Sequence, residues 1–177
     1  MLLTPQEDDL GVSRRRLSRR RLLRSGFDTD DRGWTPLHIG ARKGDVKEVK
    51  RLLNDGMDAN VAAWGTKLQG VTPLHLAAEG GHLKVMDILL ERGANIDART
   101  KGPFRWTPLH LAAKERNRKA VRFLVENGPF LPPDINDSRF NPPVHYCSGL
   151  EWAYDELKRL QDSSSSSSET SPYSSEN

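Results

Sequence analysis

Short apolar stretches, each followed by a longer amphipathic stretch, recur three times between residues 30 and 131. In the central copy the short stretch predicts a helix with small side chains on one side, which lets a neighbouring helix approach closely. Its apolar positions are Leu74, Leu76, Ala77 and Ala78. The longer stretch has mostly helical spacing and predicts a second helix. Its apolar positions are Leu83, Met86, Ile88, Leu89 and Leu90.

Residues that begin and end helices flank both stretches. Thr72 can cap the first helix, and Pro73 suits the first helical position, where its missing N–H costs nothing. Gly81 between the helices and Gly93 after the second predict left-handed turns with positive φ. The polar residues 94–100 then predict a loop or hairpin rather than a core strand.

The same markers recur at regular distances. The tetrapeptide Thr-Pro-Leu-His begins at Thr35, Thr72 and Thr107, so the spacing is 37 and then 35 residues. A glycine lies 21 residues after each threonine, at Gly56, Gly93 and Gly128. A period in this range indicates an array of supersecondary units, each too small to fold alone.

Units that open with Thr-Pro-Leu-His-x-Ala and close with the Gly-Ala-Asn-Ile-Asp-Ala of residues 93–98 resemble ankyrin repeats. The resemblance implies an all-α ankyrin-repeat solenoid, in which helix–turn–helix units carry hairpin finger loops in an L-shaped stack. Because ankyrin repeats have a period of about 33 residues, the extra residues fall in the expected fingers, 62–71 and 99–106. Three repeats are expected within residues 28–131, at about 30–60, 70–98 and 104–131.

The C-terminal part departs from this pattern. Arg116 stands where the other units have glycine, so that turn must either become left-handed at a cost or be rebuilt. Residues 132–160 predict a degenerate C-terminal capping unit, since a stack needs an end unit with a polar outer face. Its helix is expected to turn inward the side chains of Leu150, Ala153, Tyr154, Leu157 and Leu160. Residues 161–177 are Ser-rich, lack apolar content and are expected to be disordered.

Composition excludes several classes of protein. The single cysteine, Cys147, rules out an intramolecular disulfide and a cysteine-based zinc finger. No apolar run approaches the roughly 18 residues of a membrane span, and the opening residues turn acidic at Glu7, unlike a secretory signal. Residues 1–27 hold seven arginines and three acids (+7 − 3 = +4), which leaves +3 − 4 = −1 for the remainder. A nucleic-acid-binding face on the body is therefore not expected, and the chain is expected to be monomeric.

The basic arm, residues 1–27, is expected to be disordered and leaves three interpretations open. It can be a plain solvated tail, a nuclear localisation patch, or an amphipathic mitochondrial presequence, against which its acids argue. Nucleus and cytoplasm are the expected locations, with the mitochondrion as the alternative. Ser18 follows Arg15-Arg16-Leu17, which fits a basophilic kinase, and is therefore a phosphorylation candidate. Phosphate there would subtract nearly two charges from the arm.

The residues that could carry chemistry favour structural roles. His38, His75 and His110 occupy one position of successive units, about 10 Å apart, too far to share a metal. Each ring is expected to bond backbone and tie a unit to its neighbour. Cys147 has no activating base and is expected to be a small buried residue of the cap. Without a phosphate-binding loop or a carboxylate constellation, we expect neither an enzyme nor a cofactor.

The whole chain also resembles a narrower group, the phytochrome-interacting ankyrin-repeat proteins of plants. The resemblance rests on the Arg/Ser-rich leader and on the segments DDRGWTPLH, RFNPPV and GLEWAY. It implies a non-enzymatic protein that binds a protein partner in light signalling, either phytochrome or another regulatory protein. The alternative is a nuclear or mitochondrial factor whose arm targets it or contacts nucleic acid while the repeats recruit a partner.

The ankyrin pattern also implies where the partner binds. The residue before each Thr-Pro-Leu-His and the two residues after each Leu-Ala-Ala segment are expected to face the concave side, and the fingers to extend it. The implied partner-binding residues are Trp34, Arg42, Lys43, Trp64, Lys67, Val71, Glu79, Phe104, Arg105, Trp106, Lys114 and Glu115. Trp34 and Trp106 are expected to be surplus to the core, and tryptophan and arginine commonly anchor interfaces. The alternative is that these aromatic rings pack onto neighbouring fingers.

Overall fold

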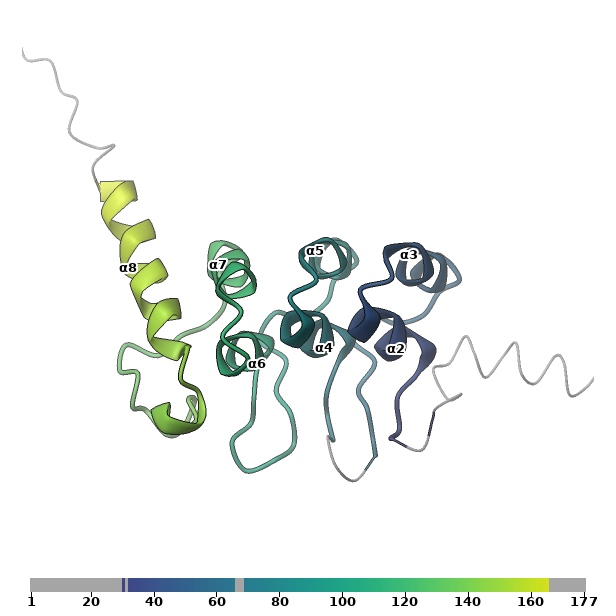
Figure 1. Cartoon of the computed structure of the whole chain (residues 1–177), viewed down its shortest axis with the longest axis horizontal. Coiled ribbons are helices and arrows are strands. Elements are labelled where there is room, and N and C mark those ends of the chain that lie inside the picture. Colours follow the sequence, from purple (N-terminus) through teal and green to yellow (C-terminus); the bar gives the residue numbers. More distant parts are fainter. Residues whose placement is uncertain (1–29, 31, 66–68, 166–177) are drawn as a thin grey trace, which may run out of the picture.

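The computed structural model describes residues 30, 32–65 and 69–165 (Figure 1). Within these ranges every regular element is helical, as the repeat pattern predicted. The elements are α2 (Pro36–Lys43), α3 (Val46–Asn54), α4 (Pro73–Gly80), α5 (Leu83–Glu91), α6 (Pro108–Lys114), α7 (Arg118–Glu126), a 3₁₀ helix η1 (Val144–Tyr146) and α8 (Leu150–Ser165).

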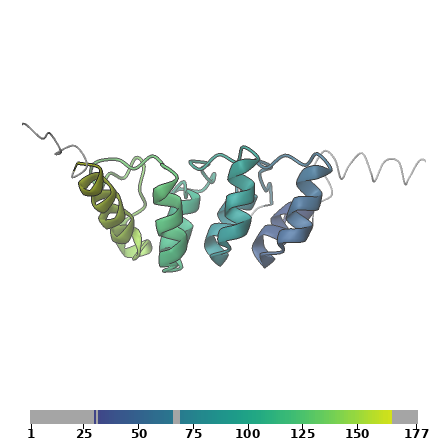
Figure 2. The same ribbon diagram turned by 90° about the horizontal axis from the view of Figure 1, so that it is seen from above.

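The helices form a stack of pairs. The inner helices α2, α4 and α6 pack in that order, and each has its outer partner, α3, α5 or α7, beside it. Figure 2 shows the outer helices as a row of neighbours, with α8 at the C-terminal end. Because α8 packs against both α6 and α7, it closes the stack as the predicted capping helix.

The repeated threonine begins each inner helix as predicted. At the first unit, the Thr35 N–H donates to Nδ1 of His38 at 3.1 Å, and the His38 N–H donates back to Thr35 Oγ1 at 3.4 Å. This reciprocal capping satisfies two backbone donors that the helix itself leaves unpaired. Thr107 makes the same pair of bonds with His110, and the Thr72 N–H likewise donates to Nδ1 of His75 at 3.1 Å.

The turns follow the glycine pattern. Gly81 has φ 71° after α4, and Gly93 has φ 84° after α5, so both predicted left-handed conformations are confirmed. In the third unit Arg116 adopts φ 56°. The turn is therefore kept rather than rebuilt, although a residue with a Cβ is less stable in that conformation.

One continuous core runs between the layers. Leu37, Leu74 and Leu109 are buried at equivalent positions of the three inner helices, and Leu150 of α8 extends the same core. All the predicted inward residues of α8 contact this core. Gly149 marks the closest approach of cap and stack, since a Cβ there would lie 2.3 Å from the Ala113 carbonyl oxygen.

The fingers are hairpin-like loops held by backbone hydrogen bonds. In the first finger the Ala63 N–H donates to the Val71 carbonyl at 2.7 Å; in the second, the Thr100 N–H donates to the Trp106 carbonyl at 2.9 Å. The Lys101 N–H also donates to the Gln69 carbonyl at 2.9 Å, which joins the two fingers. The described parts of both fingers extend beyond the inner helices on the same side of the stack (Figure 1).

The expected boundary of the C-terminal tail is wrong by five residues. Residues 161–165, expected to be disordered, continue α8 to Ser165. Hydroxyl groups of Ser163 and Ser164 donate to carbonyls three residues earlier, at 2.9 and 2.8 Å, which lets serine remain in a helix without an unpaired hydroxyl. The predictions for the arm, Ser18 and residues 166–177 lie outside the described residues.

Candidate partner-binding surface

The concave side of the stack is built from the inner helices and the fingers, but two of the residues expected there are buried. Trp34 is 4% exposed and Val71 1% exposed, and both belong to a small core under the first finger with Ala63 and Leu76. The guanidinium of Arg32 lies 3.9 Å from the centroid of the Trp34 ring. The expectation that Trp34 is surplus to the core is therefore wrong, and the packing alternative describes it.

Trp106, at the equivalent position of the third unit, is only half-buried. It lies in the wall of a groove of about 360 Å³ between the second and third repeats. The groove is lined by residues of α4, α6 and both fingers: Gln69, Val71, Leu76, Glu79, Thr100, Lys101, Gly102, Pro103, Trp106, Leu111 and Lys114. The structure thus brings the predicted residues Val71, Glu79, Trp106 and Lys114 together around one groove.

The interface between the first and second units and the interface between the second and third units differ in the charged contacts on their concave side. Between the first and second units, Nη1 of Arg42 lies 2.5 Å from Oε2 of Glu79. At the same position of the third unit stands Lys114, and no carboxylate of the described residues forms an ion pair with it. Its Nζ lies instead 5.8 Å from the centroid of the Trp106 ring, within cation–π range.

The finger residues divide into two groups. Trp64, 65% exposed, does not line the groove, and Lys67 is outside the described residues. Phe104 is half-buried and lies edge-on to Trp106, with ring centroids 5.9 Å apart. Phe104 also contacts Tyr146 of η1 at 5.1 Å between centroids.

Lys43, Arg105 and Glu115 are exposed but do not line the groove. Tyr146, 53% exposed, is an aromatic residue of this surface that the sequence analysis missed. It lies in the cap, where the repeat pattern no longer aligns positions. Its only signal in the sequence is that it directly follows Pro143-Val144-His145, which resembles the Pro-Leu-His of the repeats and lies 35 residues after His110.

The first two motif histidines tie neighbouring units together as predicted. Nε2 of His38 lies 2.8 Å from the Val71 carbonyl oxygen, and Nε2 of His75 lies 2.9 Å from that of Trp106. A carbonyl can only accept, so Nε2 carries the proton and Nδ1 is free to accept from the threonine N–H. Burial disfavours the charged ring and lowers the pKa of His75 to about 4.

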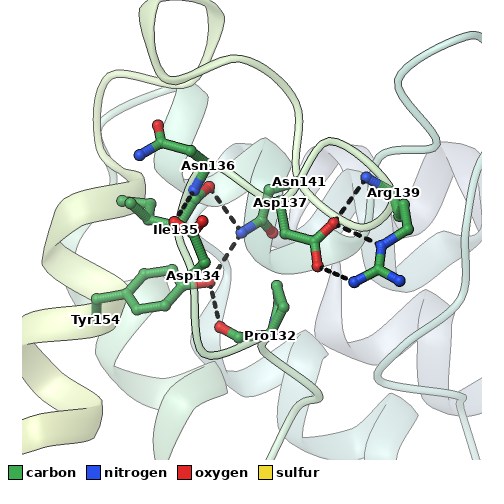
Figure 3. A network of polar contacts seen from close by, with 8 residues as sticks. All are labelled: Pro132, Asp134, Ile135, Asn136, Asp137, Arg139, Asn141 and Tyr154. Atoms are coloured by element: carbon green, nitrogen blue, oxygen red, sulfur yellow. Dashed lines mark hydrogen bonds and ion pairs between the residues drawn. The ribbon is translucent and has the colours of Figure 1, made fainter.

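His110 makes the corresponding tie to a side chain rather than to backbone. Its Nε2 lies 2.9 Å from Oδ1 of Asn141, and burial lowers its pKa to about 4. Nδ2 of Asn141 donates to the Ile135 carbonyl at 3.1 Å and to the Tyr154 hydroxyl at 2.8 Å. That hydroxyl donates to the Pro132 carbonyl, so the capping loop is fastened to α8 (Figure 3).

The remaining chemistry of the described residues is structural. Cys147 is buried, its Sγ donates to the His110 carbonyl at 3.3 Å, and burial raises the pKa of its thiol to about 12. A thiol held protonated in this way is a poor nucleophile, which agrees with the predicted packing role. Within the described ranges, no cluster of three His, Cys, Asp or Glu residues is arranged to hold a metal ion. In the same ranges, no helix has the length and apolar character needed to span a bilayer.

Comparison with known proteins agrees with this architecture. The model of the family "Ankyrin repeats (3 copies)" matches residues 18–100, and that of "Ankyrin repeat" matches residues 104–138. Phytochrome-interacting ankyrin-repeat protein 1 of Arabidopsis thaliana is 62% identical over 168 residues, which cover 94% of this chain and 96% of that protein. Phytochrome-interacting ankyrin-repeat protein 2 of the same plant is 65% identical over 160 residues, covering 90% and 91%. The chain therefore belongs to the ankyrin-repeat family.

Proposed function

We propose that this protein is a non-enzymatic binding module that recruits phytochrome through the groove between its second and third repeats. The names of the two relatives describe them as phytochrome-interacting, and their similarity extends over at least nine-tenths of this chain. The observation that carries the proposal is the open groove beside the half-buried Trp106, between the second and third repeats. The interface between the first and second repeats has no such opening there, because Trp34 is buried and Arg42 pairs with Glu79.

The physical basis is the combination of shape and lining. Val71, Leu76 and Leu111 are buried apolar residues of the groove lining, and the half-buried Trp106 exposes more apolar surface to the groove than they do. Covering this apolar surface with a partner side chain releases water and favours association. Tryptophan residues in such concave, well-packed positions often dominate the free energy of binding.

The test measures binding of the full chain to a purified phytochrome. Trp106→Ala is expected to weaken binding by at least about 1 kcal/mol, or roughly fivefold, because the wall of the groove is lost. Trp106→Phe, which keeps an aromatic ring in that wall, is expected to lose less. Lys84→Ala, on the outer helix α5, is the control and should bind as the unmodified chain does.

Circular dichroism melts show whether each variant keeps its fold. Equal binding by folded Trp106→Ala and by the control would refute the groove as the contact site. Failure of the unmodified chain to bind any phytochrome would refute the proposed partner.

For location, we propose the nucleus and cytoplasm, with the arm as the import signal. Seven arginines within residues 1–27 support this, since clustered positive charge suits an acidic receptor groove. The mitochondrion is the alternative, because an Arg- and Ser-rich leader also suits a presequence.

A further inference from the structure

The groove between α4 and α6 combines an apolar interior with positively charged residues at its rim. Together these two properties indicate what kind of polypeptide segment would bind in it. This inference rests on the proposed function, because it concerns the same groove. Its apolar lining consists of the buried Val71, Leu76 and Leu111 and of the half-buried Trp106. An apolar side chain is therefore the group that its interior accommodates best.

The rim of the groove is positive. Lys101 of the second finger and Lys114 of α6 both line it and are exposed. Among residues 30, 32–65 and 69–165, neither lysine forms an ion pair. The only carboxylate in the lining is Glu79, and Arg42 already neutralises it at 2.5 Å. Two lysines that have no ion-pair partner among the described residues therefore border an apolar depression.

The neighbouring interface shows that this combination is specific to one place in the stack. There Trp34 is buried under the first finger, and the Arg42–Glu79 pair bridges the two inner helices. Since Glu79 pairs towards the first unit, Lys114 has no corresponding partner and lies over Trp106. The repeat architecture therefore leaves both an unfilled apolar site and an uncompensated positive charge at the second interface.

We propose that the groove binds an extended acidic segment of the partner protein, in which one aliphatic or aromatic side chain is flanked by carboxylates. The apolar side chain packs against Trp106 and Leu111. The carboxylates pair with Lys101 and Lys114. Such exposed rim pairs add modest affinity but select the partner and speed its association.

The experiment presents a random peptide library, displayed on phage, to the immobilised full chain. Selected peptides are expected to carry net negative charge around one Leu, Ile, Phe or Trp. The same library is presented to the double variant Lys101→Glu/Lys114→Glu. The control is Lys84→Glu/Lys119→Glu, which makes the same change in net charge on the exposed surface of the outer helices α5 and α7.

A selected peptide is then synthesised and its Kd measured by fluorescence anisotropy. Charge reversal at the rim is expected to raise Kd at least tenfold, whereas the outer-helix control stays within twofold. Gly102→Glu gives an independent reading, because a Cβ there meets nothing within 4 Å and the backbone φ is ordinary. It adds a negative charge to the rim while both lysines remain, and is expected to raise Kd severalfold; Gly102→Gln should not.

Several outcomes would overturn the inference. These are selection of neutral or basic peptides, selection of none, or equal weakening by the rim and outer-helix variants. The proposed function can survive that failure: phytochrome binding that is lost in Trp106→Ala but unchanged in Lys101→Glu/Lys114→Glu would refute the acidic segment and keep the groove. Selection of acidic peptides by a chain that binds no phytochrome would support the acidic segment and refute phytochrome as the partner.

Discussion

Acidification should destabilise this stack by an amount that can be worked out from two buried histidines. His75 and His110 have pKa values of about 4 in the folded chain, against an ordinary value of 6.5, because burial disfavours the charged rings. Between these limits the unfolded chain binds more protons than the folded one. Stability is therefore retained above about pH 6.5 and falls as the pH decreases towards 4.

The magnitude follows from the two pKa values. At pH 5 each histidine favours the unfolded state by about 2 kcal/mol relative to neutral pH, so the pair removes about 4 kcal/mol. His38, whose pKa is also lowered by burial, acts in the same direction. Small domains have unfolding free energies of only about 5–15 kcal/mol. The stack should therefore lose a large part of its unfolding free energy by pH 5.

The assay is equilibrium urea unfolding of the full chain, followed by circular dichroism between pH 7.5 and pH 5 at constant ionic strength. The midpoint is expected to fall by roughly 2 M urea for a typical dependence on denaturant. In His75→Gln, which cannot titrate, the loss should shrink by about 2 kcal/mol although the neutral-pH stability is lower.

An unfolding free energy that stays constant to within about 1 kcal/mol over this pH range would refute the reasoning. The same conclusion would follow if His75→Gln retained the full pH dependence of the unmodified chain. Either result would mean that the rings are not held neutral by burial.

Three further predictions concern other parts of the chain. Gly93→Val should lower stability by roughly 1–3 kcal/mol, since φ 84° suits a β-branched residue poorly; an unchanged thermal midpoint would contradict this. Trp34→Ala should lower the urea-unfolding free energy by about 3–5 kcal/mol, because it empties the small core under the first finger; a loss below 1 kcal/mol would count against that packing. A large fluorescent fusion of residues 1–27 should enter the nucleus and disperse when Arg14, Arg15, Arg16, Arg19, Arg20 and Arg21 become alanine, whereas mitochondrial import with removal of the leader would favour the presequence.

Much of the fold was predictable because its signals are local and recur. Thr72 and Pro73 begin a helix, Gly81 and Gly93 permit left-handed turns, and three copies reinforce one another. The first two histidine contacts also follow from the repeat, since His38 and His75 each meet the backbone carbonyl of the residue before the next Thr-Pro-Leu-His.

The candidate site was less predictable because it depends on contacts between units. Trp34 and Trp106 occupy the same motif position, yet the first is buried and the second is half-exposed. Whether Glu79 pairs towards Arg42 or towards Lys114 is a choice between partners 37 and 35 residues away. Sequence periodicity makes such positions look equivalent, and only the packing of fingers and side chains distinguishes them.

The amide of Asn141 has a consequence for how long the array can be. In the earlier units the acceptor for a histidine is a backbone carbonyl at the base of the next finger. Every added unit would supply such a carbonyl, so the same contact could recur in a longer array. At His110 the acceptor is a single side chain whose other atoms are engaged by Ile135 and Tyr154 within the same cap. A fourth full unit grafted after α7 would therefore have to displace this amide. Asn141 therefore ends the series of histidine contacts between units at His110.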